Sequence, residues 1–464
     1  MNRNRANKKT IWIVVALVAV LIAAAIIYFL LRDTGNEKGA TEMGASADYK
    51  LDVQMDDQNR FQITADINVL NESDETFEDL GFYLIPNAIN SDDMPELAQA
   101  SAEVAVESVK RGDEELSYSL DNNKLLVELE TGLESESTEE ITVAYTMKLP
   151  ENGMRLSQDG DNYFLAQWYP MLAQYDKGWD IQDFDMNGES YHSGFGNFEV
   201  SYKLPKEYLV ASSAAEGDIR PSSSGTVKGE RIKDFYLAFL NTEEWLSESV
   251  EVNETVLRLF MPMDQEFMDE NIAKAKAAYA FFEERIGDNP FPELDIIAND
   301  GYMEYPNVIE VASTWDALDE VLVHEIGHQW FYYIVGNDPY EDAWLDESVT
   351  EFATSIFLSD YYQDEDYGFR SAQMAADAYR QEKYANLPLS EYNEGEYVST
   401  VYGEAPLVLR NFFEERGGND EALEFLGAYY KEYQFKYVNT PTFKDFFTSY
   451  YGEEQREFLD SWLQ

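Results

Sequence analysis

The chain has 464 residues, a formal net charge of −57 and no cysteine. So acidic a protein repels nucleic acid and anionic lipid headgroups, which excludes both as partners of its surface. The absence of cysteine excludes disulfides as a source of stability. The length exceeds that of one ordinary domain and predicts two.

The N-terminal end predicts a membrane anchor. Residues 1–10 contain basic but no acidic side chains, and residues 11–31 are apolar and uncharged. As a helix, residues 11–31 would be about 31 Å long, which matches the roughly 30 Å hydrocarbon core of a bilayer. A cleaved signal peptide is the alternative, but its apolar part is usually only about 7–15 residues long. The basic flank makes residues 1–10 a cytoplasmic tail and places everything after Arg32 outside the cell.

Residues 32–47 have no hydrophobic period and predict a linker. From residue 48 to about 250, apolar and polar side chains alternate in short segments separated by Asn, Asp, Gly and Pro, which predicts an all-β domain of antiparallel strands. The expected strands are 49–55, 61–70, 80–85, 124–130, 141–149, 198–204 and 234–240.

Helical periods dominate residues 251–464, with a short β-rich stretch at 293–312, so the second domain is expected to be α+β. The expected helices are 264–286, 315–334, 344–362, 367–382, 405–415, 420–432 and 443–450.

The motif His324-Glu325-Ile326-Gly327-His328 carries the clearest chemical signal, because the chain has only three histidines. A spacing of four places His324 and His328 on one helix face, where both can bind one Zn²⁺. Glu325 is rotated away from the metal and can act as general base on the attacking water. Packing of two histidines against a core is the alternative.

A catalytic zinc requires a third protein ligand and one open position. Glu347 follows on the next expected helix, and the turn through Gly336, Asn337 and Pro339 can return it to the histidine pair. One zinc ion per chain, held by His324, His328 and Glu347, is therefore expected.

These residues resemble the gluzincin, or M1-type, zinc peptidases, the family of aminopeptidase N. The segment Gly301-Tyr302-Met303-Glu304 is similar to that family's Gly-x-Met-Glu-Asn motif, with Tyr305 in place of the asparagine. The resemblance implies that Glu304, with Gly301 and Met303, binds the free α-amine of the substrate. An ordinary surface acid is the alternative for Glu304, since the chain has 90 Asp and Glu residues.

Other candidates rest on the same resemblance. Tyr402 is similar in position to the tyrosine that stabilises the oxyanion, with Tyr397 as the alternative and core packing as a third possibility. Gln167 is expected to help bind the amine, whereas Glu351 either orients a ligand histidine or lies on a solvated helix face. The remaining histidine, His192, is expected to be structural.

The resemblance implies a multidomain α+β protein with an all-β saddle or sandwich domain and a thermolysin-like zinc peptidase domain, which follow the N-terminal membrane anchor predicted from residues 1–31. It would be a short form without the large helical C-terminal domain of bigger members. The expected activity is zinc-dependent removal of N-terminal residues from extracellular peptides. A zinc endopeptidase with the same ligands and a non-catalytic surface binding protein are the alternatives. The membrane, through residues 11–31, and peptide substrates are the expected partners.

Overall fold

The computed structural model describes residues 40, 43–89, 102–151, 155–185, 188–262, 264–315, 318–379 and 383–464. Residues 41–464 pack as one compact unit. The predicted anchor, residues 11–31, lies outside the described residues, so it stays a prediction. Within the part of the chain that is described, no helix is both long enough and apolar enough to cross a membrane.

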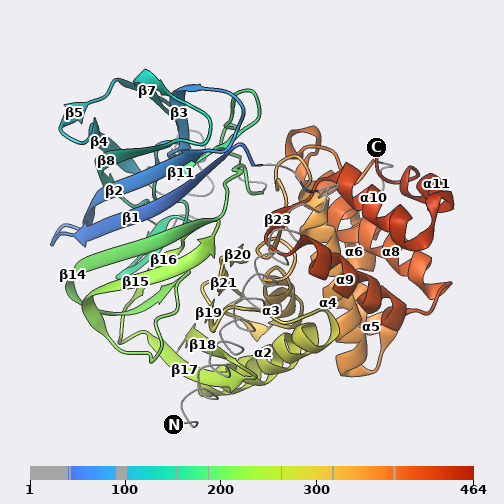
Figure 1. Ribbon diagram of the computed structural model, residues 1–464. Helices are drawn as coiled ribbons and strands as arrows, with labels where there is room; N and C mark the ends of the chain where they lie inside the picture. The colour runs from blue at the N-terminus through green and yellow to red at the C-terminus, as the bar shows by residue number, and fades with distance from the viewer. Residues whose placement is uncertain are drawn as a thin grey trace, which may run out of the picture. The chain divides into compact units, whose positions relative to one another are not determined.

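The chain is a multidomain α+β protein whose first half is built from strands (Figure 1). A ten-stranded sheet has the order β5-β4-β8-β2-β1-β14-β16-β10-β9, with β15 paired to β14, and a four-stranded sheet has the order β11-β3-β7-β6. The strands of the large sheet are β1 (Ala45–Met55), β2 (Arg60–Asn71), β4 (Glu103–Arg111), β5 (Glu114–Glu115), β8 (Thr138–Lys148), β9 (Ser157–Asp159), β10 (Asn162–Leu165), β14 (Gly196–Ser212), β15 (Ser222–Ile232) and β16 (Leu237–Leu240). The smaller sheet contains β3 (Phe77–Tyr83), β6 (Tyr118–Asp121), β7 (Lys124–Leu133) and β11 (Met171–Leu172).

Alternation of side chains gives these sheets their common core. In β1 every second residue is buried, as expected for a strand with one face on the core and one toward solvent. Leu51 of β1 and Ile63 of β2 share one apolar cluster with Phe82 of β3 and Leu125 of β7. The two sheets are therefore held together by burial of apolar side chains. A short ribbon, β12 (Gln174–Tyr175) with β13 (Trp179–Asp180), follows the smaller sheet.

The second half begins with a five-stranded mixed sheet of order β17-β18-β19-β21-β20. Its strands are β17 (Trp245–Val252), β18 (Thr255–Pro262), β19 (Glu293–Ile297), β20 (Met303–Tyr305) and β21 (Val308–Glu310). The boundary expected at residue 250 thus falls within β17. Strand β20, which lies at the edge of this sheet, carries Glu304. A further pair joins β22 (Val335–Gly336) to β23 (Lys436–Tyr437).

Helices make up most of the remainder; α3 lies beside β20 and β21 and packs against α4 (Figure 1). The helices are α2 (Gln265–Arg285), α3 (Leu318–Gly327), α4 (Glu347–Tyr362), α5 (Glu365–Gly368), α6 (Arg370–Ala378), α7 (Glu394–Tyr397), α8 (Ala405–Glu414), α9 (Asn419–Tyr433), α10 (Thr440–Tyr451) and α11 (Arg456–Leu459), with a π-helix η5 (Val398–Glu404). Short 3₁₀ turns are η1 (Ile85–Asn87), η3 (Ala343–Leu345), η4 (Leu389–Glu391) and η6 (Glu453–Gln455).

A buried ionic cluster lies where β14 meets the mixed sheet. The Arg258 guanidinium donates to both carboxylate oxygens of Asp295, at 2.6 Å each. Glu293 and Glu216 lie 3.3 and 3.7 Å from the same guanidinium. Burial, together with the neighbouring Asp295, raises the pKa of Glu216 and that of Glu293 to about 7 each, against the partial opposition of Arg258.

This cluster predicts a pH-dependent stability. The folded-state pKa of Glu216 lies above its unfolded value of 4.5. The stability that this residue contributes to the folded state is therefore fully present below about pH 4.5 and is lost as the pH rises through about 7. The shift corresponds to roughly 3 kcal/mol as an upper bound. Glu216→Gln, which removes the titrating group, is therefore expected to stabilise the chain by about 1–3 kcal/mol near pH 8 and to change it little below pH 4.5. Urea unfolding at both pH values measures this, with the exposed Glu207→Gln as control; equal shifts in both variants would contradict it.

Candidate active site

Two elements bring the predicted metal ligands together. Helix α3 carries His324 and ends at Gly327, so His328 lies in the turn that follows, and α4 begins with Glu347. Gly327 allows the two helices to approach closely, because a Cβ at this position would lie 2.9 Å from the Thr350 side chain of α4. The helix expected to continue to residue 334 is shorter than predicted: it ends at Gly327, and turns follow, with a φ of 141° at Tyr332.

The donor atoms of the three side chains face a common point. His324 Nε2 lies 2.9 Å from His328 Nε2 and 3.1 Å from Glu347 Oε2, and His328 Nε2 lies 3.3 Å from the same carboxylate oxygen. All three side chains are buried. Ligands bound tetrahedrally to Zn²⁺ at about 2.0–2.1 Å are separated by roughly 3.4 Å, so this donor set fits a zinc ion.

The outer ring nitrogens of both histidines have acceptors. His324 Nδ1 lies 3.1 Å from Glu351 Oε2, and His328 Nδ1 lies 3.1 Å from the carbonyl oxygen of Phe331. A carbonyl can only accept, so Nδ1 of His328 carries the proton, and a carboxylate favours the same tautomer for His324. When both rings are neutral, their Nε2 lone pairs point toward each other and toward the Glu347 carboxylate, an arrangement that a metal cation stabilises.

The electrostatics of the ligands agree with a cation site. Burial opposes a charged Glu347, but the two histidines outweigh it and hold the pKa of this carboxyl well below its usual range. Burial likewise opposes a charged His324, yet hydrogen bonds to Glu347 and Glu351 raise its pKa. The carboxylate of Glu347 is thus ionised and available as a metal ligand.

Glu325 is placed to act on a molecule beside the metal ligands. Its side chain is buried, and its Oε2 has no hydrogen-bond partner among the described residues. One carboxylate oxygen each of Glu325 and Glu304 and one ring nitrogen of His328 lie within 4.8 Å of one another. Burial, with a further contribution from Glu347, raises the pKa of Glu325 to about 8. A group of this kind is suited to exchange a proton near neutral pH.

Glu304 extends from the edge strand β20 toward the same point. It is buried, its Oε1 has no hydrogen-bond partner among the described residues, and burial raises its pKa. Met303 is buried in an apolar cluster behind the strand. Gly301 is required by packing, because a Cβ there would lie 2.3 Å from the carboxylate of Glu310, which is itself hydrogen-bonded to Tyr236 and Asn299.

Tyr402 lies in the π-helix η5, an irregularity that is frequent at functional sites. The centre of its ring is 5.8 Å from that of His324, and its hydroxyl interacts with Glu347. The ring of Tyr397 packs edge-on against Tyr402 at 5.6 Å. The structure thus brings Tyr402 to the metal ligands, with Tyr397 directly behind it.

Two other candidates lie in different surroundings. The Gln167 amide donates to the Tyr191 hydroxyl at 3.3 Å and to Asp234 at 3.4 Å, so it is engaged beside the site. His192 Nδ1 lies 3.5 Å from Asp180 and 3.4 Å from Asp338. His192 thereby links the β half of the chain to the loop that precedes Glu347.

Sequence reasoning missed three charged residues at this site: Arg155, Glu189 and Lys233. One carboxylate oxygen of Glu189 lies within 4.8 Å of those of Glu304 and Glu347, and Glu189 pairs with Arg155 at 3.0 Å. Lys233 places its ammonium 3.4 Å from the centre of the Tyr332 ring. All three come from segments of the β half without a recognisable motif, so only the tertiary structure identifies them.

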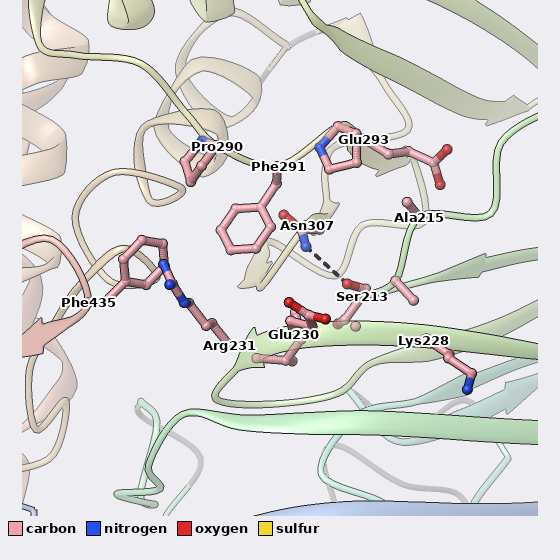
Figure 2. A pocket seen from close by; sticks show the side chains of 14 residues that line it. Ser213, Ala215, Lys228, Glu230, Arg231, Pro290, Phe291, Glu293, Asn307 and Phe435 are labelled. Carbon is pink, nitrogen blue, oxygen red and sulfur yellow. Dashed lines mark hydrogen bonds between the residues drawn. The ribbon is translucent and has the colours of Figure 1, made fainter. Parts of the chain in front are cut away.

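A separate pocket of about 300 Å³ lies where β15 meets the segment before β19 (Figure 2). Arg231 faces the ring of Phe435 at 4.7 Å, and Asn307 donates to the carbonyl oxygen of Ser213 at 3.0 Å. The pocket contains none of the predicted ligands or catalytic residues.

Comparison with known proteins agrees with this geometry. Residues 295–462 match the peptidase family M1 domain. Human aminopeptidase B is 27% identical over 155 residues, which is 31% of this chain and 24% of that protein. Aminopeptidase 2 of Candida albicans is 23% identical over 235 residues, 45% of this chain and 25% of that protein. These matches thus span about a quarter of the length of each curated relative.

Solved structures share the fold over most of the chain. The M1 zinc metallopeptidase of Deinococcus radiodurans superposes with a TM-score of 0.63 at 14% identity, covering 92% of this chain and 95% of that one. Leukotriene A4 hydrolase from Saccharomyces cerevisiae superposes with a TM-score of 0.60 at 14% identity, covering 92% and 69%. The M1 domain match over residues 295–462 and the three converging metal ligands together support a zinc metallopeptidase of the M1 type.

Proposed function

We propose that the protein is an aminopeptidase that removes the first residue of extracellular peptides. The observation that carries the proposal is the position of Glu304. Its buried carboxylate lies beside the predicted base Glu325 and the ligand His328. A carboxylate fixed at this place favours an ammonium group and disfavours the neutral interior of a peptide chain. The site would therefore bind the start of a chain.

The relatives support the same substrate class. The human and Candida albicans proteins are named as aminopeptidases. A two-domain M1 zinc metallopeptidase is described with bound L-tryptophan, and the enzyme of Deinococcus radiodurans is described with a Tyr-Ser-Ala substrate. Peptides with a free N-terminus are accordingly the proposed substrates of this chain.

The proposed mechanism assigns one role to each side chain. His324, His328 and Glu347 would hold the zinc. When bound, zinc polarises the scissile carbonyl and lowers the pKa of a water molecule to about 7. Glu325 accepts a proton from the attacking water and transfers it to the leaving amine. Tyr402 donates a hydrogen bond to the developing oxyanion, and Glu304 fixes the α-ammonium.

The proposal includes where the protein lies in the cell. Residues 11–31 would anchor the chain in the cell membrane, and the basic flank would keep residues 1–10 in the cytoplasm and the catalytic part outside. Membrane fractionation after alkaline carbonate washing tests this. The full chain should stay in the membrane pellet, and a chain without residues 1–32 should not; release of both would contradict the anchor.

Paired peptides test the activity directly. We expect the full-length protein to release the first amino acid from a peptide with a free α-amine and not from its acetylated twin. A zinc chelator should abolish the release, and Glu304→Gln should weaken the release from the free-amine peptide. Equal cleavage of both peptides would favour an endopeptidase. Absence of chelator-sensitive cleavage across a broad panel would favour the surface binding protein.

A further inference from the structure

His192 is not part of the candidate active site, and it lies where the two halves of the chain meet. Its Nδ1 is 3.5 Å from Asp180 Oδ2 and 3.4 Å from Asp338 Oδ2, and the three donor atoms lie within 4.8 Å of one another. Asp180 belongs to β13, His192 to the segment before β14, and Asp338 to the loop between β22 and η3. Three separate segments therefore bring one imidazole nitrogen and two carboxylates to a common point.

The fold fixes each aspartate through one oxygen and leaves the other directed at His192. Asp180 Oδ1 accepts from the side-chain amide of Gln182 at 2.8 Å. Asp338 Oδ1 accepts from two backbone N–H groups of the loop that follows it, at 3.0 and 3.2 Å. The two Oδ2 atoms are thus held in position by contacts that the other oxygen of each carboxylate makes.

The separations of the donor atoms fit a metal ion better than a shared proton. A hydrogen bond from an imidazolium N–H to a carboxylate is normally about 2.7–2.9 Å long. The distances of 3.4 and 3.5 Å exceed this range for both aspartates. Ligands bound tetrahedrally to Zn²⁺ at about 2.0–2.1 Å are roughly 3.4 Å apart, and imidazole and carboxylate groups are both among its usual ligands.

Gln174 gives an independent indication that a ligand binds at this point. It pairs with Asp180 across β12 and β13, and its backbone N–H donates to the carbonyl oxygen of His192 at 3.2 Å, beside an antiparallel bridge. Side chains opposite each other on neighbouring strands lie on one face, so the Gln174 amide lies on the face that carries His192 and Asp180. The side chain is buried, and neither its oxygen nor its nitrogen has a hydrogen-bond partner among the described residues. A buried amide of this kind requires a partner, which a bound cation and its water molecules would supply.

The charge at this point also favours a cation. Within the described residues, neither Asp180 nor Asp338 forms an ion pair with a lysine or an arginine. Burial, with a contribution from Asp338, raises the pKa of Glu341 and that of Asp342, which follow in the same loop. A divalent cation would compensate this accumulation of acids.

We propose that Asp180, His192 and Asp338 form a second zinc site, separate from the active site. The ion would bind His192 Nδ1 and one oxygen of each aspartate, with the amide of Gln174 beside it. It would fasten the β half of the chain to the loop that leads to Glu347. The role of this zinc is to stabilise the fold, so the site does not depend on the proposed peptidase activity.

Counting the zinc bound to the full-length protein tests this. At micromolar zinc, native mass spectrometry should find two ions per chain in the wild type and one in His192→Phe. Phenylalanine keeps a ring and removes the Nδ1 ligand, and it costs no hydrogen bond at Nε2, which has no partner among the described residues. Glu347→Gln at limiting zinc should keep the second ion and lose it when His192→Phe is added. Anomalous diffraction at the zinc edge should place this ion between the three side chains.

Asp183→Asn is the matched control, because Asp183 is an exposed acid near Asp180 that pairs with Lys124. It should keep both ions. Saturating zinc should raise the melting temperature of Glu347→Gln by at least about 2 °C, and that of the variant that also carries His192→Phe by less. If His192→Phe does not fold, Asp180→Asn replaces it as the ligand variant, since asparagine can still accept from Gln182.

A wild type that binds one zinc, or a second zinc that survives the loss of His192, would overturn the second site and leave the proposed peptidase untouched. A melting temperature that depends on pH through His192 but not on zinc would also overturn it, because a protonated imidazole would then bridge the two acids. Loss of peptidase activity with two zinc ions still bound would instead contradict the proposed function and leave the second site standing.

Discussion

Replacement of Glu325 by glutamine is expected to lower kcat about 10²–10⁴-fold while the protein keeps its zinc. Glu325 is buried and one of its oxygens has no partner among the described residues, so it is available to a reacting molecule. Burial, with a further contribution from Glu347, raises its pKa to about 8, so the carboxyl can exchange a proton near neutral pH. Glutamine preserves the shape of the side chain but cannot accept the proton of water.

Steady-state kinetics with a free-amine peptide, together with metal analysis of the same preparations, measures this effect. Glu320→Gln is a suitable control, because Glu320 lies on the same helix and forms a surface ion pair with Arg370. The control should retain activity and zinc. If Glu325→Gln retained more than about a tenth of the wild-type kcat, Glu325 would not be the general base.

Much of the fold was predictable because its elements follow simple periods. The expected strand 49–55 appears as Ala45–Met55, and the expected helix 420–432 appears as Asn419–Tyr433. Both have buried side chains at the spacing that the period demands. Strand β15 was missed, because the segment Ser222–Ile232 is polar and contains two glycines; among the described strands it pairs with β14 alone.

Long-range pairing could not be predicted from local patterns. Strand β1 pairs in parallel with β14, so Tyr49 lies opposite Phe198 across a long sequence separation. Apolar periodicity indicates which face of a strand is buried, but it does not identify the neighbouring strand. The same limit applies to the junction of the two halves, where Phe164, Tyr236 and Tyr305 share one apolar cluster.

The residues of the site also divide into those that local spacing predicts and those that only the folded structure brings together. The spacing of His324 and His328 within one helical turn makes them a recognisable pair, and the structure places Glu347 beside both. Glu189 belongs to a loop without a motif, and its carboxylate reaches the site only because β14 and its neighbours position that loop. Roles that depend on local spacing are visible in a single sequence, whereas roles that depend on convergence of distant segments require the fold.

Glu347→Gln is expected to weaken zinc binding by at least about 100-fold and to abolish activity at limiting zinc. In the structure one oxygen of Glu347 lies 3.1 and 3.3 Å from the Nε2 atoms of the two histidines. Its lowered pKa means that this site is built around a carboxylate anion. Glutamine offers a neutral oxygen, so the buried site loses the negative charge that compensates a divalent ion.

Glu351→Gln separates this effect from simple loss of packing. Glu351 accepts from His324 Nδ1 at 3.1 Å and orients the ring without being one of the three converging ligands. Its replacement should weaken zinc binding by only about 10–100-fold, the usual effect of an orienting partner. Zinc titration against a competing chelator measures both variants, and excess zinc should restore activity to Glu351→Gln more readily than to Glu347→Gln. Equal zinc affinities in the two variants would mean that Glu347 orients a ligand and that another group completes the site.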